Sequence, residues 1–331
     1  MAKKTCIGVE IGNSRIKIAE TRDGSLVRFM ADYVPENTVR QGEIIQWEAM
    51  GDFLKDSLKK GGFSGKKAAL AVPDELVFTR RIRMPAMSAS QLEVNLPYEF
   101  HDFISDDKEK YFYDYSMIGL LRNEEDIVTE MDLVGVAVSK ELMDNYVSMF
   151  KRAGLKLVTA APANRALENL TRRLDPKMGE SDFALLDLGS NATVVDIFSN
   201  GIYQVTRSIE TGCRMIAEAA ADVMGTDPHI AELYIRENRE QILSHERCQE
   251  LYSQIAIDVM RAINYYTFEN PDNTLETIYY FGGGSYIQPL VNEIADTIPL
   301  RMIPLADMAN TELTNVEAVM NGAAACGICF N

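Results

Sequence analysis

The sequence predicts a two-lobed α/β fold, in which each lobe contains a mixed sheet flanked by helices. The chain has 331 residues, and at roughly 100–200 residues per domain this length predicts two domains or one large fold with two lobes. Apolar residues make up 47% and charged residues 25%, which is the balance of an ordinary folded protein. A strand–turn–strand pattern occurs twice, in separate halves of the chain, and helical segments follow each copy.

The repeated pattern spans residues 5–33 and 183–210. In each copy an apolar strand ends in acid-x-Gly, a small polar turn follows, and a second alternating strand leads to an Asp-Gly or Asn-Gly pair. Such pairs are strong hairpin signals because type I′ turns need positive φ angles. The glycines of the first and second turn are equally far apart in both copies, at Gly12 and Gly24 and at Gly189 and Gly201. This agreement predicts a duplicated fold with two lobes that face each other.

The tips of the two hairpins have the chemistry of a phosphate site. Gly12 and Gly189 have no Cβ, so the backbone N–H groups at each tip stay open to a ligand. Two such tips that face each other would hold a polyphosphate, as nests of amides do. Glu10 and Asp187, at the strand ends, would hold Mg²⁺, usually through water. The alternative is two ordinary meanders with acidic ends in solvent; one copy alone favours this alternative, and the recurrence argues against it.

Three consecutive glycines, Gly282, Gly283 and Gly284, follow an apolar strand, and a helical pattern comes directly after them. A strand-to-helix turn without side chains lets the backbone lie flat against a base or a phosphate. It also points the helix N-terminal amides at that ligand. Glycine turns are common, so this signal depends on its position after the two hairpins. We expect the turn to belong to the same site.

The remaining segments predict helices and strands around the hairpins. Residues 75–160 have the pattern of an inserted α/β unit, with a helix capped by Ser139 and stopped by Gly154. We predict a first lobe at 1–160, with its core at 1–74 and the insert at about 75–160. A connecting helix at 161–180 leads to a second lobe at 181–314, which has a helical subdomain at about 211–272. A C-terminal helix at 315–331 is predicted to pack on the first lobe.

A positive stripe of Arg80, Arg81 and Arg83 lies in the first strand of the insert. A solvated strand face paired with nearby acids is the favoured interpretation, and part of a partner surface is the alternative.

Charge and composition exclude several classes of function. The net charge is −16, so the chain repels a phosphate backbone and an anionic membrane surface, and we expect no nucleic-acid partner and no direct membrane insertion. Glu10 interrupts the first apolar run, which does not fit a signal peptide. Five cysteines fit free thiols in a reducing compartment, with Cys326 and Cys329 as small apolar residues of a terminal helix. We therefore expect a cytoplasmic protein.

The order of two phosphate hairpins and a glycine-rich adenosine motif resembles the actin-like ATPase superfamily. The three motifs here are EIGNSRIK, DLGSNATVV and FGGGS. Within that superfamily, nearly the whole chain is similar to the PilM family of type IV pilus assembly proteins. The likeness is carried by VEIGNSRIKIAE, LPYEFHDFI, KELMDNYVSMFKRAGLKLV and IETGCRMIAEAAADVMG.

The resemblance implies an assembly adaptor that binds ATP and Mg²⁺ between its lobes. It also implies a second ligand near the insert, the cytoplasmic N-terminal peptide of a PilN-like inner-membrane protein. Other inner-membrane platform components of pilus or type II secretion-like machines would be further partners, with recruitment to the inner face of the cytoplasmic membrane through a partner. Carried over onto this sequence, the cofactor-binding residues are Gly12, Asn13, Ser14, Arg15, Lys17, Asp187, Gly189, Ser190, Asn191, Thr193, Gly212, Glu232, Gly282, Gly283, Gly284 and Ser285. The candidate Mg²⁺ ligands, through water, are Glu10 and Asp187, and no catalytic residue is assigned.

Three departures from the family pattern concern catalysis. Glu10 stands where relatives usually have Asp, and its extra methylene changes the geometry of a water-bound magnesium. Ile216 replaces a helix-start threonine, where only Gly212 of a glycine pair remains, and Ile235 replaces a lysine that faces the nucleotide in relatives. Together these changes predict weak hydrolysis of ATP, or a pocket that binds nucleotide loosely or not at all.

Two other functions of the superfamily stay open as alternatives. A sugar or small-molecule kinase needs a carboxylate base near the acceptor hydroxyl, and beyond Asp187 the sequence offers none that we can place. His101, His229 and His245 fit surface or helix-cap positions. A filament-forming protein similar to FtsA is the second alternative.

Overall fold

The computed structural model describes residues 5–40, 42–308 and 315–330. It divides into two compact units: unit 1 comprises Met1–Asn169 and Ala324–Asn331, and unit 2 comprises Leu170–Ala323. The chain first passes from unit 1 to unit 2 inside α4 (Ala163–Leu174). The boundary that the sequence predicts between residues 314 and 315 adjoins residues 309–314, which lie outside the described ranges.

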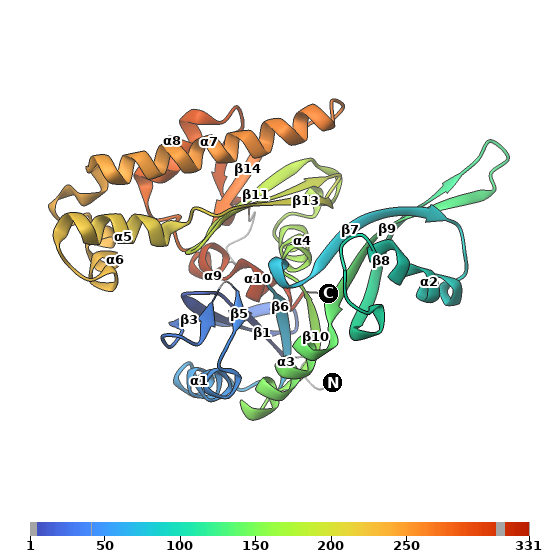
Figure 1. The fold of residues 1–331 in the computed structure, drawn as a ribbon, viewed down its shortest axis with the longest axis horizontal. Coiled ribbons are helices and arrows are strands. Elements are labelled where there is room, and N and C mark those ends of the chain that lie inside the picture. The colour runs from blue at the N-terminus through green and yellow to red at the C-terminus, as the bar shows by residue number, and fades with distance from the viewer. Residues whose placement is uncertain (1–4, 41, 309–314, 331) are drawn as a thin grey trace. The chain divides into compact units, whose positions relative to one another are not determined.

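Unit 1 contains a five-stranded mixed sheet in the order β10-β6-β1-β2-β3 (Figure 1). The first three strands along the chain form an antiparallel meander, and β6 and β10 extend it with parallel pairing. Two short strands, β4 (Val39–Arg40) and β5 (Glu43–Ile44), pair with each other beside the meander. The bounds of the sheet strands are Thr5–Ile11 for β1, Arg15–Arg22 for β2, Ser25–Tyr33 for β3, Lys67–Val72 for β6 and Lys156–Pro162 for β10.

Two amphipathic helices, α1 (Trp47–Lys60) and α3 (Lys140–Arg152), bury their apolar sides in the core of unit 1. The Ser139 side chain accepts a hydrogen bond from the backbone of the first turn of α3, which confirms the predicted cap. At the other end Gly154 has a φ of 81°, a left-handed conformation that glycine adopts without strain and that ends the helix.

The insert of unit 1 is a three-stranded antiparallel sheet in the order β7-β9-β8, with β7 at Phe78–Pro85, β8 at Tyr111–Arg122 and β9 at Val128–Ser139. One face is covered by α2 (Ala89–Asn95) and the 3₁₀ turn η2 (Leu96–Phe100), which bury Leu92, Leu96 and Phe100. Pro97 lies where α2 gives way to η2, as expected of a residue without a backbone N–H. Shorter 3₁₀ turns, η1 (Asp74–Leu76) and η3 (Lys108–Lys110), lie on the connections.

Unit 2 contains a second five-stranded sheet, in the order β13-β12-β11-β14-β15. When each sheet is numbered along the chain, both have the same order, and both join an antiparallel meander to two parallel strands. The predicted tight turns are also confirmed, since Asp23-Gly24 and Asn200-Gly201 all have positive φ. The strands are β11 (Phe183–Leu188), β12 (Thr193–Ser199), β13 (Ile202–Ile209), β14 (Thr277–Phe281) and β15 (Arg301–Pro304). The structure therefore confirms two mixed sheets flanked by helices.

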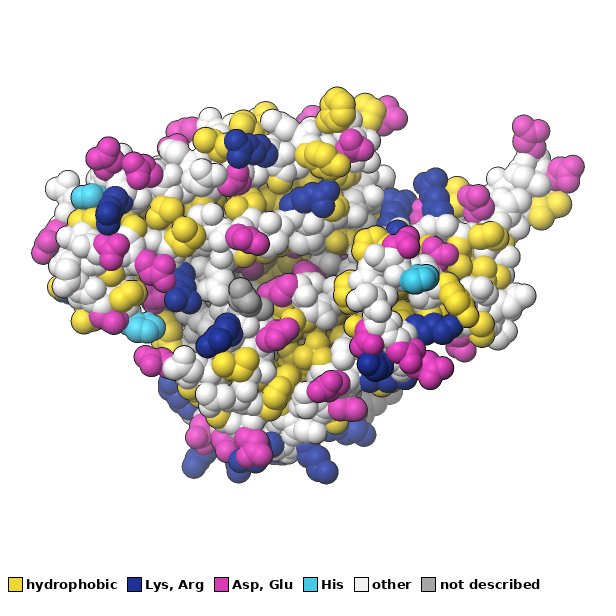
Figure 2. Space-filling model, in the orientation of Figure 1, with side chains coloured by type: hydrophobic (Ala, Val, Ile, Leu, Met, Phe, Trp, Pro, Cys, Tyr) yellow, Lys and Arg dark blue, Asp and Glu magenta, His cyan; other side chains and the backbone are white. Residues whose placement is uncertain are grey.

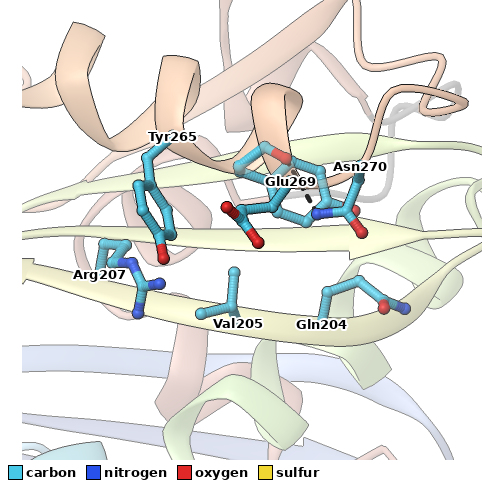
Figure 3. A pocket seen from close by; sticks show the side chains of 7 residues that line it. Gln204, Val205, Arg207, Tyr265, Glu269 and Asn270 are labelled. Atoms are coloured by element: carbon cyan, nitrogen blue, oxygen red, sulfur yellow. Dashed lines mark hydrogen bonds between the residues drawn. The ribbon is translucent and has the colours of Figure 1, made fainter.

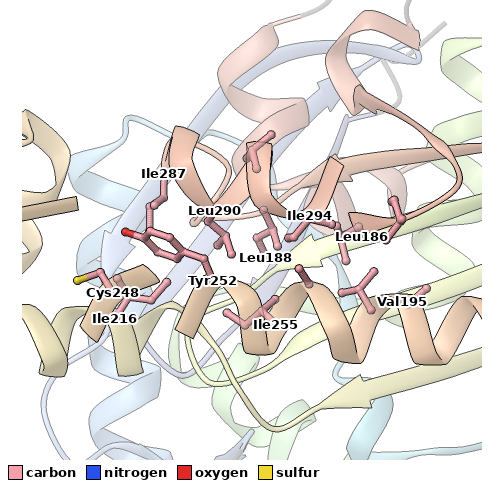
Figure 4. Packing of buried hydrophobic residues seen from close by; sticks show 14 of the residues in the cluster. Leu186, Leu188, Val195, Ile216, Cys248, Tyr252, Ile255, Ile287, Leu290 and Ile294 are labelled. Atoms are coloured by element: carbon pink, nitrogen blue, oxygen red, sulfur yellow. The ribbon is translucent and has the colours of Figure 1, made fainter. Parts of the chain in front are cut away.

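Four helices of unit 2, α5 to α8, share one apolar core with the strands of this sheet, and Figure 4 shows part of it. The long helix α7 (Glu246–Glu269) and α8 (Gln288–Thr297) bury Ile255, Leu290 and Ile294 against strands β11 and β12. Helices α5 (Cys213–Met224) and α6 (Pro228–Glu237) extend the core; Asp227 caps α6 by accepting a hydrogen bond from the His229 amide. The connecting 3₁₀ turns are η4 (Pro176–Glu180), η5 (Arg239–Ser244) and η6 (Leu305–Met308).

The predicted C-terminal helix forms as two short helices, α9 (Val316–Asn321) and α10 (Ala323–Gly327), which Gly322 separates. From Ala324 onward the chain belongs to unit 1. There it lies directly on β1, since a Cβ at Gly8 would come within 1.9 Å of the Ala325 carbonyl oxygen. None of the described helices combines the length and the apolar character that crossing a membrane requires.

Candidate functional site

The predicted site residues are divided between the two units, and each group is described by itself. In unit 1 they occupy the turn between β1 and β2, which is closed by a hydrogen bond of 2.9 Å from the Gly12 amide to the Arg15 carbonyl. The carbonyl of Ser14 accepts a hydrogen bond from the Val34 amide, which holds the turn beside the end of β3.

The charged and amide side chains of this turn have partners within unit 1. The Asn13 Oδ1 atom accepts a hydrogen bond of 2.8 Å from the Gly42 amide. Arg15 donates to the Tyr33 hydroxyl at 2.7 Å, and its guanidinium lies 4.4 Å from the centre of that ring. Lys17 forms an ion pair with Glu10, its directly opposite neighbour in the antiparallel pairing. A cation at Glu10 would therefore have to share the carboxylate with Lys17.

In unit 2 the predicted residues come from four segments, and three of these meet at one place; the fourth contributes Glu232 from α6. The backbone amides of Cys213 and Arg214, at the start of α5, donate to the carbonyls of Gly189 and Ser190 at 3.0 and 2.8 Å. The Gly284 amide donates to the Leu188 carbonyl at 2.8 Å. The turn after β11, the start of α5 and the triple glycine therefore lie against one another.

The glycines of this cluster are required by the packing of the chain on itself. An added Cβ would lie 2.6 Å from the Ala192 carbonyl oxygen at Gly189, and 2.3 Å from the Ser190 carbonyl oxygen at Gly212. At Gly282, where φ is 96°, it would lie 2.1 Å from an oxygen of Asp187. Close packing of the chain is thus one reason for glycine at these positions, and the predicted approach of a ligand stays a prediction. At Gly283 an added Cβ would meet no described atom within 4 Å.

Acidic groups set the electrostatics of the unit 2 cluster. Burial, together with the nearby charges of Asp187 and Glu232, raises the pKa of the Cys213 thiol to about 12. The thiol is therefore neutral and is not a candidate nucleophile. Thr193 donates its hydroxyl to the Thr211 carbonyl at 2.9 Å, which fixes the segment that leads into α5. Asp187 and Glu232 are therefore the carboxylates nearest to the Cys213 thiol, and carboxylate oxygens are the ligands that Mg²⁺ prefers.

The helix after the triple glycine begins later than the sequence predicts. α8 begins at Gln288, and the intervening residues form turns in which the Ser285 and Ile287 amides donate to the carbonyls of Gly282 and Gly284. The Gly282 amide donates to the Met320 carbonyl, and the Gly284 amide to Leu188. The amides of Gly282, Gly284, Ser285 and Ile287 are therefore engaged within the chain.

Sequence reasoning did not find the exposed apolar side chains of the insert. Phe112, Met117 and Leu120 of β8 are 50%, 44% and 52% exposed, and Figure 2 shows apolar side chains among charged ones on the insert, around α2 and β8. One signal in the sequence could have found them, because Phe112 is apolar although it occupies an outward-facing position of an alternating strand. The arginine stripe follows the favoured interpretation, since Arg81 and Arg83 both pair with Asp132, at 2.6 and 3.7 Å.

Comparison with solved structures identifies the fold. A structure of the PilM–PilN type IV pilus biogenesis complex matches with a TM-score of 0.83 and 18% identity, over 98% of this chain and 97% of the other. The ethanolamine utilization protein EutJ from Carboxydothermus hydrogenoformans matches with a TM-score of 0.62 and 15% identity, over 100% of this chain and 91% of the other. The duplicated sheets, hairpins and glycine turn define a protein of the actin-like ATPase fold.

The family described as type IV pilus assembly protein PilM matches residues 8–321. Since this match covers nearly the whole chain, the chain belongs to that family. The resemblance seen in the sequence is confirmed, and a role in type IV pilus assembly follows from the family.

Proposed function

We propose that this protein is an assembly adaptor that binds the N-terminal cytoplasmic peptide of a PilN-like membrane protein through its insert. In this proposal it binds ATP with Mg²⁺ as a structural ligand and hydrolyses it weakly or not at all. Family membership and the exposed apolar strand β8 are the observations that support the adaptor role. The partner would recruit the protein to the inner face of the cytoplasmic membrane, beside the other platform components.

The insert has the features of a peptide-binding surface. β8 lies at the edge of its three-stranded sheet, and an edge strand offers backbone N–H and C=O groups to a partner segment. Phe112, Met117 and Leu120 add apolar area along that strand. By the pairing of β8 with β9, Met117 and Leu120 lie on the face that α2 covers and Phe112 lies on the other, so both faces of the edge strand offer apolar contacts to a partner segment.

The nucleotide part of the proposal rests mainly on unit 2. Asp187, the glycine turn and the turn at residues 189–192 lie together there, and Glu232 adds a second carboxylate that would attract a divalent cation. The two positions where catalytic residues of relatives are replaced, Ile216 and Ile235, are 0% and 2% exposed and belong to the apolar core. Their side chains therefore stabilise the fold and offer nothing to a phosphate, which supports weak hydrolysis.

The partner proposal is tested with a fluorescent synthetic peptide that copies the N-terminal cytoplasmic segment of a PilN-like protein. We expect an anisotropy increase with the full chain, and a loss of at least about tenfold in affinity, equivalent to about 1.4 kcal/mol, for Phe112→Glu and Leu120→Glu. The matched control is Val27→Glu, which changes an exposed residue on another edge strand of unit 1, β3, and leaves binding unchanged. Equal affinity in all four proteins would contradict the proposal.

The nucleotide proposal is tested by titration calorimetry with ATP, with and without Mg²⁺. We expect Asp187→Asn to weaken the magnesium-dependent part of binding by about tenfold, because it removes one of the two nearby carboxylates, and Glu10→Gln to weaken it less. A coupled assay with ATP alone and with a panel of sugars separates the alternatives. Strong sugar-dependent turnover of ATP would favour the kinase. In a separate centrifugation experiment, sedimentation of the protein in the presence of ATP and Mg²⁺ would favour the filament.

A further inference from the structure

An open groove of about 370 Å³ lies in unit 2 between β13 and the last turns of α7. Figure 3 shows Tyr265 and Glu269 of α7 directed toward Arg207 and Val205 of β13. The Arg207 guanidinium lies 5.3 Å from the centre of the Tyr265 ring. The apolar Val205 and the cationic Arg207 of β13 therefore face the anionic Glu269 and the Tyr265 ring of α7 across the groove.

β13 forms an edge of its sheet, so one side of its backbone pairs with no strand among the described residues. The pairing of β12 with β13 slips by one residue after Val205, and Gln204 is the extra residue of β13. Such bulges are frequent at sheet edges, where they redirect a side chain. Here Gln204 lines one end of the groove, together with Asn270 of the α7 C-cap. An edge strand beside a helix is the arrangement in which extended peptides add a strand to a sheet.

The charges of the groove specify what such a peptide would carry. α7 ends at Glu269, and the last turn contains no basic residue to offset the negative end of the helix dipole. Glu269 and the exposed Asp272 add negative charge at the same end. A cation above Val205 would therefore be attracted by a carboxylate and by the helix terminus together. Arg207, two residues along β13, attracts an anion instead.

We propose that this groove binds an extended segment of a partner protein, which adds to β13 as a further strand. The segment carries a lysine or arginine opposite Val205, with its aliphatic stem on Val205 and its charge at Glu269. Two residues away it carries an acidic side chain that pairs with Arg207. This second docking site goes beyond the proposed function, which concerns the insert of unit 1.

The proposal is tested with the fluorescent heptapeptide Thr-Val-Glu-Thr-Lys-Val-Thr and the full chain at low ionic strength. A peptide in which glutamate replaces lysine is the comparison. We expect the lysine peptide to bind about threefold to tenfold more tightly, a range set by the modest strength of partly exposed ion pairs, with the difference falling as salt is added. Hydrogen exchange should show protection of β13 amides by the bound peptide.

Glu269→Lys should reverse the preference between the two peptides, and Glu250→Lys, an exposed change on α7 outside the groove, should leave it intact. Both residues are exposed, so neither change threatens folding. The proposal would be overturned if millimolar peptide neither bound nor protected the β13 amides from hydrogen exchange. It would also be overturned if Glu269→Lys still preferred the lysine peptide to the same extent as the parent. Binding of the PilN-like peptide should be the same in Glu269→Lys, so the two docking sites are tested separately.

Discussion

The two hairpins at the centre of this fold share a frame and differ at their tips. In unit 1 the terminal acid, Glu10, lies opposite Lys17 and forms an ion pair with it. In unit 2 the equivalent acid, Asp187, lies opposite Val194, and the backbone of Gly282 packs against its carboxylate. One acid is therefore paired within its own hairpin, whereas the other lies against the glycine turn.

The comparison shows that a duplicated backbone need not give duplicated chemistry. The turn of the second hairpin is one residue longer, at 189–192, and β12 is one residue shorter than β2. The equal spacing of the glycines in sequence therefore conceals different tips. In our proposal the cation-binding charge comes mainly from Asp187 in unit 2.

The largest effect is expected from Gly282→Ala, which removes the contact between the glycine turn and Asp187. The new Cβ would lie 2.1 Å from the carboxylate in a backbone with φ of 96°, so we expect a loss of about 3 kcal/mol or more in the free energy of unfolding. Urea denaturation measures this loss. Gly283→Ala, with open space at its Cβ, is the control and should change stability by less than about 1 kcal/mol. Equal stability of the two variants would contradict the packing described here.

A second difference between the units concerns a buried acid. Asp196 of β12 is 2% exposed and accepts a hydrogen bond of 2.5 Å from the Thr206 hydroxyl, whereas the equivalent residue of β2 is Ala19. Burial raises the pKa of Asp196 to about 6 from its ordinary 3.8. The folded protein thus holds this proton more tightly than the unfolded chain, and the stability that it contributes is full below about pH 4 and is lost as the pH rises through about 6.

Asp196→Asn should remove this pH dependence. We expect the variant to be more stable than the parent by about 2–3 kcal/mol at pH 7.5 and nearly equal to it at pH 4, as measured by urea denaturation across that range. Asp272→Asn, an exposed change in the same unit, should follow the parent at every pH. A parallel pH profile for the parent and Asp196→Asn would show that Asp196 is not the group responsible.

The smallest effects are expected at the turn glycines themselves. Gly189→Ala places a Cβ 2.6 Å from a backbone oxygen, and Gly12→Ala places one at 3.3 Å. We expect losses of about 1–2 kcal/mol for Gly189→Ala and less than about 1 kcal/mol for Gly12→Ala, because only the first requires the turn to move. Calorimetry with ATP on the folded variants then tests whether either tip binds phosphate. A larger loss for Gly12→Ala would reverse the comparison.

Much of the fold could be predicted from the sequence because its signals are local. Asp23-Gly24 and Asn200-Gly201 mark the turns, and Ser139 and Asp227 mark helix starts. The chemistry of the hairpin tips depends on the cross-strand register, which places Lys17 opposite Glu10. A sequence motif alone does not specify this register. The crowding at Gly282 involves contacts between segments about a hundred residues apart, and no local pattern encodes them.

The return of the chain to β1 has a consequence for the order in which the protein is made. The backbone of residues 324–330 completes unit 1 and lies on Gly8, so a fragment that stops at residue 169 lacks the material that covers β1. Unit 1 is therefore completed only by residues that follow the whole of unit 2 in the order of the chain. Removal of residues 324–330 should therefore uncover β1 and disturb unit 1 before unit 2.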